Sequence, residues 1–163
     1  MGMFDFLKKK KNDAIVIAAP IEGEVVASSD IPDPVFSEEM MGKGVAIKPA
    51  VGKVFAPVDG EVAMVFDTKH AVTLASKDGV EILIHIGLDT VSLGGAPFTV
   101  HVEAGDAVKT GDLLVEFDME AIKAAGLEVI TPVVICNSDD FPGMERFTGK
   151  QVKPGDAIME LSK

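Results

Sequence analysis

Short apolar runs, rich in Val, Ile and Phe, recur along the chain and are separated at close intervals by Gly, Pro and Asp. Runs of this length, bounded by turn-forming residues, are typical of the strands of an all-β sandwich or barrel. The pattern predicts strands at residues 15–18, 23–27, 45–49, 54–56, 60–65, 72–75, 80–86, 98–102, 113–117, 129–135 and 157–161.

Helical structure is predicted to be short. Residues 119–125 form one candidate helix, with Asp118 before it as the N-cap, and a further turn is expected at 37–41. Residues 12–163 show no internal boundary and are predicted to form a single β-sandwich domain. Residues 1–11 differ, because apolar positions are followed by four consecutive lysines. We expect this basic amphipathic segment to be flexible and to make at most weak peripheral contact with an anionic membrane.

Two pairs of similar sequence segments indicate an internal duplication. Residues 19–25 (APIEGEV) recur as 56–62 (APVDGEV), and residues 102–107 (VEAGDA) resemble 152–157 (VKPGDA). Each segment reads as a turn at the end of a short strand. Two copies are too few for a solenoid, so they predict a duplicated β unit folded into one body.

Charge and cysteine content limit the functional classes. The net charge is −11 and no basic stripe is visible, which argues against nucleic-acid binding and is compatible with a basic protein partner. The chain has one cysteine, Cys136, which excludes an internal disulfide, fits a reducing compartment and is expected to be buried. Neither a membrane-spanning apolar run nor a secretory signal is visible. We therefore expect a cytoplasmic protein, peripheral to the inner membrane face only through residues 1–11.

The candidate site is centred on His85, which lies in the middle of the strongly apolar run 79–91, with His70 fifteen residues upstream. Asp78-Gly79 is a preferred pair for a two-residue type I′ hairpin loop. In that register Val72 pairs with His85, and His70 lies diagonally on the same face, about 7–8 Å away along the backbone.

The register also decides which side chains surround the histidines. The two-residue loop puts Leu83, Val72 and Leu74 on the histidine face. Ile82, Ile84 and Ile86 would then point into the core. A three-residue loop would move His70 to the opposite face, because one register step reverses every side chain.

Histidine suits group transfer near neutral pH, since its neutral ring carries one basic and one donor nitrogen. A backbone carbonyl that accepts from the donor nitrogen would present the other nitrogen as a nucleophile. Small polar or hinge residues, Thr68 and Gly87, flank the two histidines, and Asp33 and Asp89 are candidates for a carboxylate rim.

The segment 79–91 resembles the phosphorylation-site signature of the glucose-type enzyme IIA proteins of the bacterial sugar phosphotransferase system. The likeness covers nearly the whole chain. It includes residues 19–24, 32–36, 44–49, 56–60, 68–71 and 130–134.

The resemblance implies an antiparallel β-sandwich, a barrel-sandwich of the duplicated hybrid motif type, with a shallow apolar active-site face. It implies that His85 accepts a phosphoryl group on Nε2 from the carrier protein HPr and passes it to a cysteine of a IIB domain. His70 would contact the phosphoryl group, Thr68 would hydrogen-bond within the pair, and the Gly87 carbonyl would hold His85 Nδ1.

Partner docking is implied for a set of apolar and acidic residues around the histidines. These are Asp33, Val35, Phe36, Met40, Met41, Phe66, Leu83, Asp89 and Val91. The methionines stand where branched aliphatic residues are expected in the family. The resemblance requires no cofactor beyond the covalent phosphoryl group, allows regulatory targets as further partners, and leaves the sugar open, because a membrane component selects it.

Two alternative functions stay open at the sequence level. The spacing of His85 and Asp89 occurs in some β-rich zinc peptidases, but the further His-x-His pair that those enzymes need is missing. His70 and His85 could still bind zinc adventitiously, so a zinc-dependent β-fold hydrolase is one alternative. A biotinyl- or lipoyl-like carrier domain is the other, with Lys77 at a hairpin tip.

Overall fold

The computed structural model describes residues 14–163. Its strands are β1 (Ile15–Ala18), β2 (Gly23–Ala27), β3 (Lys43–Pro49), β4 (Lys53–Phe55), β5 (Gly60–Val65), β6 (Ala71–Ser76), β7 (Glu81–His85), β8 (Phe98–Val100), β9 (Ala107–Val108), β10 (Leu113–Phe117), β11 (Thr131–Ile135), β12 (Gly143–Arg146), β13 (Lys150–Val152) and β14 (Ala157–Ser162). Its helical segments are α2 (Pro34–Ser37), α3 (Met119–Ala124) and the 3₁₀ turns η1 (Ser28–Asp30), η2 (Thr90–Leu93) and η3 (Ser138–Asp140).

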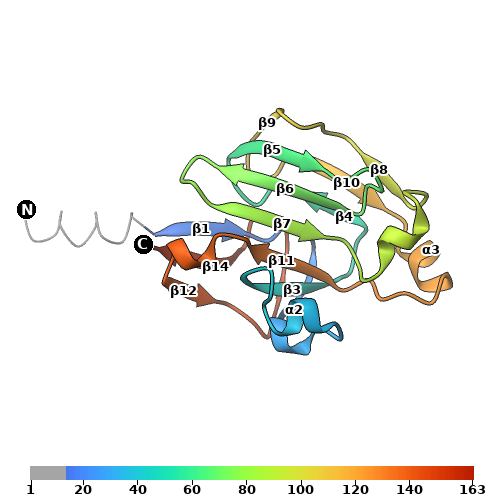
Figure 1. Ribbon diagram of the computed structural model, residues 1–163, viewed down its shortest axis with the longest axis horizontal. Helices are drawn as coiled ribbons and strands as arrows, with labels where there is room; N and C mark the ends of the chain where they lie inside the picture. Colours follow the sequence, from blue (N-terminus) through green and yellow to red (C-terminus); the bar gives the residue numbers. More distant parts are fainter. Residues whose placement is uncertain (1–13) are drawn as a thin grey trace, which may run out of the picture.

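The strands form one sheet of eight, in the order β13-β2-β3-β11-β7-β6-β5-β9, and two sheets of three, β1-β14-β12 and β4-β10-β8. Every pairing between these strands is antiparallel. In Figure 1, β5, β6 and β7 cross the upper half of the molecule, β1, β14 and β12 lie at the left, and β8 and α3 lie at the right. The predicted all-β antiparallel sandwich is confirmed.

Strand β7 is covered on both faces. Ile82 and Ile84 are fully buried in the main core, whereas Leu83 belongs to a second apolar cluster with Phe36 and Val134. A strand buried on both sides has its register fixed by packing, since burying each large aliphatic side chain is worth about 1.5–3 kcal/mol. The second cluster forms the floor beneath His85, the last residue of β7.

The β6–β7 hairpin differs from the prediction by one residue. Ala71 pairs with His85 and Thr73 with Leu83, and the Ser76 N–H donates to the Val80 carbonyl at 2.9 Å, so the loop has three residues. Ser76 Oγ accepts from the N–H groups of Asp78 and Val80, and Gly79 is left-handed at φ 85°. The predicted two-residue turn is therefore wrong.

The observed register also corrects the predicted faces. Val72 and Leu74 lie in the main core with the isoleucines of β7 and do not share the histidine face. Leu83 does lie on that face, and Ala71 is buried beside it in the second cluster.

The two Ala-Pro repeats pack against each other. The Ala18 N–H donates to the Pro57 carbonyl at 3.0 Å, and the Phe55 N–H donates to the Pro20 carbonyl at 2.7 Å. Each repeat also meets a Gly-Asp turn, since Ala19 N donates to Asp156 O and Ala56 N to Asp112 O. The two copies of the duplicated unit predicted from the sequence are thus joined by equivalent hydrogen bonds.

Other local predictions have mixed outcomes. Helix α3 begins after Asp118, whose carboxylate accepts from the Ala121 N–H at 3.1 Å as predicted. Helix α2 begins earlier than the turn predicted at 37–41, because Asp33 caps it and Pro34 occupies its first position. Cys136 is exposed rather than buried.

The strands β9, β12 and β13 were not predicted. The N-terminal segment 1–11 lies outside the described residues. No helix within residues 14–163 is long and apolar enough to span a bilayer.

Candidate active site

His85 is half-buried at the end of β7, where the chain leaves the sheet. Its Nδ1 lies 2.8 Å from the Gly87 carbonyl oxygen. Because a carbonyl can only accept, Nδ1 carries the proton and donates it, and Nε2 of the neutral ring keeps a free lone pair.

The turn after β7 accommodates only glycine at position 87. Its φ is 74°, and a Cβ atom at this position would lie 2.7 Å from Thr90 Cγ2 and 2.8 Å from the Glu128 carbonyl oxygen. Both contacts are shorter than real Cβ atoms make, so the chain can pass this point only as glycine. The carbonyl that orients His85 therefore has a fixed place.

Thr90 is a contributor to the site that the sequence analysis missed. It is fully buried, and its hydroxyl donates to the Ile86 carbonyl. The Leu88 N–H donates to the Glu128 carbonyl at 3.0 Å, so the loop that carries Gly87 is held on both sides. The available signal was a threonine near the end of the signature segment 79–91.

His70 reaches the site from the turn that precedes β6. The ring centroids of His70 and His85 lie 4.8 Å apart, with the rings at 82° to each other. Lys69 is left-handed at φ 61°, and the His70 carbonyl accepts from the Ile86 N–H at 2.7 Å. The two rings are close together, as expected. The turn before β6 brings them together, however, and not the predicted diagonal pairing between the two strands.

The partner of His70 is the hydroxyl of Thr68. Thr68 Oγ1 and His70 Nδ1 are 2.7 Å apart. A hydroxyl can donate or accept, so this bond is compatible with a proton on His70 Nε2, the nitrogen not used by Thr68. That arrangement makes His70 a hydrogen-bond donor beside the free nitrogen of His85.

Both histidines have pKa values below the usual value of 6.5. Burial, and then the proximity of His85, lowers the pKa of His70 to about 4. Burial also lowers the pKa of His85, against the opposing effects of the Gly87 hydrogen bond, Asp33 and Asp89. At neutral pH both rings are neutral, and the lone pair of His85 Nε2 is available.

An apolar pocket of about 270 Å³ opens beside His85. Eight of the nine predicted docking residues line it with His85; these are Asp33, Val35, Phe36, Met41, Phe66, Leu83, Asp89 and Val91. The ring centroid of Phe36 is 5.0 Å from that of His85, and that of Phe66 is 5.4 Å from that of His70. Met40 is 71% exposed and does not line the pocket.

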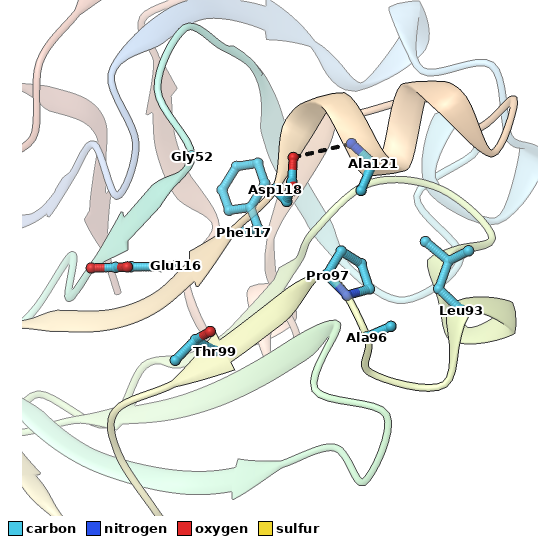
Figure 2. A pocket seen from close by; sticks show the side chains of 9 residues that line it. All are labelled: Gly52, Leu93, Ala96, Pro97, Thr99, Glu116, Phe117, Asp118 and Ala121. Carbon is cyan, nitrogen blue, oxygen red and sulfur yellow. Dashed lines mark hydrogen bonds between the residues drawn. The ribbon is translucent and has the colours of Figure 1, made fainter.

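A larger cavity, of about 610 Å³, lies elsewhere, between α3 and the segment that leads into β8 (Figure 2). Figure 2 shows no histidine among the residues that line it, and the Asp118 carboxylate there is engaged with the Ala121 N–H. The third histidine, His101, is exposed and lies 3.8 Å from Glu116. The candidate site is therefore identified by its paired histidines and not by the volume of its pocket.

Residues 14–163 are the part of the chain whose side chains can be compared with a metal site. No cluster of three or more His, Cys, Asp or Glu side chains in that part of the chain is arranged to hold a metal ion. His70 and His85 are the two side chains of the site that could donate nitrogen to an added ion.

Comparison with known proteins identifies the family. Residues 15–141 match the family model described as phosphoenolpyruvate-dependent sugar phosphotransferase system, EIIA 1. The chain belongs to this family. The resemblance noted in the sequence is thereby confirmed.

Individual relatives agree with this EIIA assignment. The chain is 47% identical over 150 residues to the PTS system glucose-specific EIIA component of Oceanobacillus iheyensis, covering 92% of this chain and 91% of that one. It is 51% identical over 147 residues to the beta-glucoside-specific EIIBCA component of Bacillus subtilis, covering 90% of this chain but 24% of that longer protein. The solved structure of glucose permease IIA from Mycoplasma capricolum superimposes with a TM-score of 0.86 at 36% identity, covering 92% and 97% of the two chains.

Membership of the EIIA family gives the chain its general role. It is a phosphocarrier in sugar uptake and a component of the phosphotransferase system. The family favours neither a zinc-dependent hydrolase nor a biotinyl- or lipoyl-like carrier.

Proposed function

We propose that His85 carries the phosphoryl group on Nε2, receiving it from phospho-HPr and giving it to a cysteine of a IIB domain. The observation that carries this proposal is the 2.8 Å hydrogen bond between His85 Nδ1 and the Gly87 carbonyl, which leaves Nε2 unprotonated. The lowered pKa of His85 adds support, because the ring stays nucleophilic at neutral pH.

The acceptance step forms one bond and breaks one. The lone pair of His85 Nε2 attacks phosphorus, and the bond between phosphorus and the donor atom of phospho-HPr breaks. The ring becomes positively charged, and the Gly87 carbonyl, which accepts from Nδ1–H, stabilises that charge. In the onward step the IIB thiolate attacks phosphorus, the Nε2–P bond breaks, and the ring returns to its neutral form.

His70 assists without carrying the group. With the Thr68 hydroxyl donating to Nδ1, the His70 Nε2–H donates to an oxygen of the transferring phosphoryl group. Phosphoryl transfer depends mainly on positioning and charge stabilisation, so a fixed neutral donor is sufficient and no cofactor is needed beyond the covalent phosphoryl group. The apolar pocket excludes water, which protects the phosphohistidine from hydrolysis.

Partners dock on the rim of the pocket. Val35 and Val91 are 39% and 52% exposed, and they offer apolar surface to a carrier protein. Asp33 and Asp89 stand at the same rim and favour partners with a basic face. The Bacillus subtilis relative joins B, C and A components in one chain, which supports a IIB domain as the acceptor.

The sugar and the compartment are also part of this proposal. Relatives that this chain matches over almost their whole length are named glucose-specific, which supports glucose as the sugar. We place the reaction in the cytoplasm, where a sugar phosphotransferase system meets its phosphoenolpyruvate.

The test is intact-mass spectrometry at neutral pH after mixing the chain with phosphoenolpyruvate, enzyme I and HPr. Wild type and His101→Ala should each gain one acid-labile phosphoryl group, and His85→Ala should gain none. His70→Gln should accept the group but pass it on slowly to IIB. Absence of any adduct with active donor proteins, or a full adduct on His85→Ala, contradicts the proposal.

A further inference from the structure

We infer that Glu39 and Arg146 form a positioning pair that fixes the loop 38–42, between α2 and β3, so that its methionines face docking partners. The inference rests on the proposed function, because it concerns how partners reach His85. Neither residue contacts a histidine ring or lines the 270 Å³ pocket. The pair acts through the loop and not on the phosphoryl group.

The contact joins two distant parts of the chain. Arg146 is the only arginine of the 163 residues. It lies at the end of β12, and its Nη1 is 2.6 Å from Glu39 Oε2 although 107 residues separate the two. The side chains are 29% and 26% exposed, so water screens this pair less than it would a surface pair.

The same two groups also hold the backbone at the end of the loop. Glu39 Oε2 accepts from the Gly44 N–H at 3.3 Å, and Arg146 Nη1 donates to the Gly44 carbonyl at 3.0 Å. That carbonyl accepts a second bond, from the buried Ser28 hydroxyl at 2.7 Å. The Glu39 carboxylate thus lies between a cationic side chain and the first buried residue of β3, where it closes the loop.

The loop backbone depends on these contacts. Glu39 is left-handed at φ 56°, a conformation that residues with a Cβ atom adopt reluctantly. The remaining hydrogen bonds of the loop are mostly local, such as Met40 N to Val35 O at 3.1 Å. The long-range ion pair therefore holds the side chain of the one residue of the loop whose backbone is unfavourable.

The loop carries two exposed methionines, one of which lines the pocket. Met41 is 43% exposed and lines the pocket with His85, and Met40 is 71% exposed beside it. Side chains so exposed have little packing of their own, so the backbone beneath them sets their position. Releasing Glu39 from Arg146 should move the apolar rim and leave the histidines unchanged.

The experiment measures acceptance from phospho-HPr at varied HPr concentration for Glu39→Ala, Arg146→Ala and the double variant. KM should rise about threefold to tenfold in each single variant, with kcat unchanged, and the double variant should be no worse than either single one. Arg146→Lys, which keeps the charge but replaces the planar guanidinium with an ammonium group, should recover part of the loss. Glu120→Ala, which breaks the exposed 4.0 Å pair with Lys123 on α3, is the matched control and should leave KM unchanged.

A second background separates positioning from general destabilisation. In the Met40→Ala/Met41→Ala protein, Glu39→Ala should add nothing to KM, because the side chains through which it acts are gone. Additive effects there, or a fall in kcat without a change in KM, would overturn the inference. If Glu39→Ala does not fold, Glu39→Gln retains an acceptor for both donors, and a smaller rise in KM is then the expected result. If wild type itself accepts no phosphoryl group, the proposed function fails first.

Discussion

The two histidines of the site differ in the hydrogen-bond partner that each ring has, and this difference separates their roles. His85 faces a carbonyl, which can only accept, so its tautomer is fixed with the lone pair on Nε2. His70 faces a hydroxyl, which can donate or accept, so His70 can present a proton on Nε2. In the proposed function, His85 is the nucleophile, and His70, whose ring centroid lies 4.8 Å from that of His85, is the hydrogen-bond donor.

The low pKa of His70, about 4, predicts a dependence of stability on pH. In the unfolded chain the pKa of this histidine is near 6.5, so the unfolded state binds more protons between pH 6.5 and 4, and the folded state loses stability as the pH falls. We expect urea unfolding to show that, between pH 7 and pH 5, wild type loses about 2 kcal/mol of unfolding free energy relative to His70→Gln. Parallel curves for the two proteins would contradict the buried neutral ring.

The Thr68 hydroxyl predicts a second effect, on transfer rate. Thr68→Val keeps the side-chain shape but removes the 2.7 Å bond to His70 Nδ1, so the ring is no longer held with its Nε2–H toward His85. We expect onward transfer to IIB to slow about tenfold, the equivalent of one hydrogen bond of roughly 1.4 kcal/mol. Rapid-quench measurements on Thr68→Val and on the control Thr68→Ser, which keeps the hydroxyl, provide the test. Equal rates for Thr68→Val and wild type would remove the hydroxyl from the mechanism.

Among the elements, the β6–β7 hairpin shows which structural features could be predicted from the sequence. The strands themselves were predictable from their β-branched runs, and so was the turn between them. The loop length was not, because Asp78-Gly79 fits either a two-residue turn or the end of a three-residue loop with left-handed glycine. The Ser76 hydroxyl favours the three-residue loop because it accepts from the N–H groups of Asp78 and Val80, and nothing in the local sequence requires those bonds.

Backbone conformation and long-range contacts explain what the sequence could not predict. His70 was expected near His85 from strand pairing, yet a left-handed Lys69 brings it there. The strands β12 and β13 contain few β-branched residues and exist because β14 and β2 offer them hydrogen-bonding edges. The contact of Glu39 with Arg146 has no local signature at all.

The strained turn before β6 carries its own prediction. Lys69 has φ 61°, and left-handed backbone costs an ordinary L-residue about 1–2 kcal/mol while Asn tolerates it better. Lys69→Asn should therefore raise the unfolding free energy by about 0.5–1 kcal/mol and leave phosphoryl acceptance intact. Urea denaturation provides the measurement, with Lys77→Asn as a control, since Lys77 is an exposed loop lysine without positive φ. An equal gain in the control would assign the effect to charge instead of to backbone strain.

At the scale of the whole molecule, the charge is the dominant feature. The net charge of −11 includes the four lysines at 8–11, which lie outside the described residues, so the described part is more acidic than the chain as a whole. Such a body repels acidic proteins and attracts basic ones over roughly one Debye length, about 10 Å at 0.1 M salt. Asp33 and Asp89 concentrate this preference at the pocket of His85.

This charge distribution predicts that kcat/KM for acceptance from phospho-HPr falls as salt rises from 0.05 to about 0.5 M, because screening removes the attraction between the partners. Asp33→Asn/Asp89→Asn should flatten that dependence. Asn can still cap α2 at position 33 and tolerates the φ of 58° at position 89, so the fold is preserved.

The control for this salt experiment is Asp78→Asn/Asp139→Asn, which removes the same total charge near the hairpin tip, at the opposite end of β7 from His85. If net charge alone steers the partners, both double variants flatten the salt dependence equally. If the rim carboxylates steer them, only the pair beside His85 does so. We expect the second result, because a charge that contacts the partner acts within a Debye length, whereas the hairpin tip lies at the other end of β7 from His85.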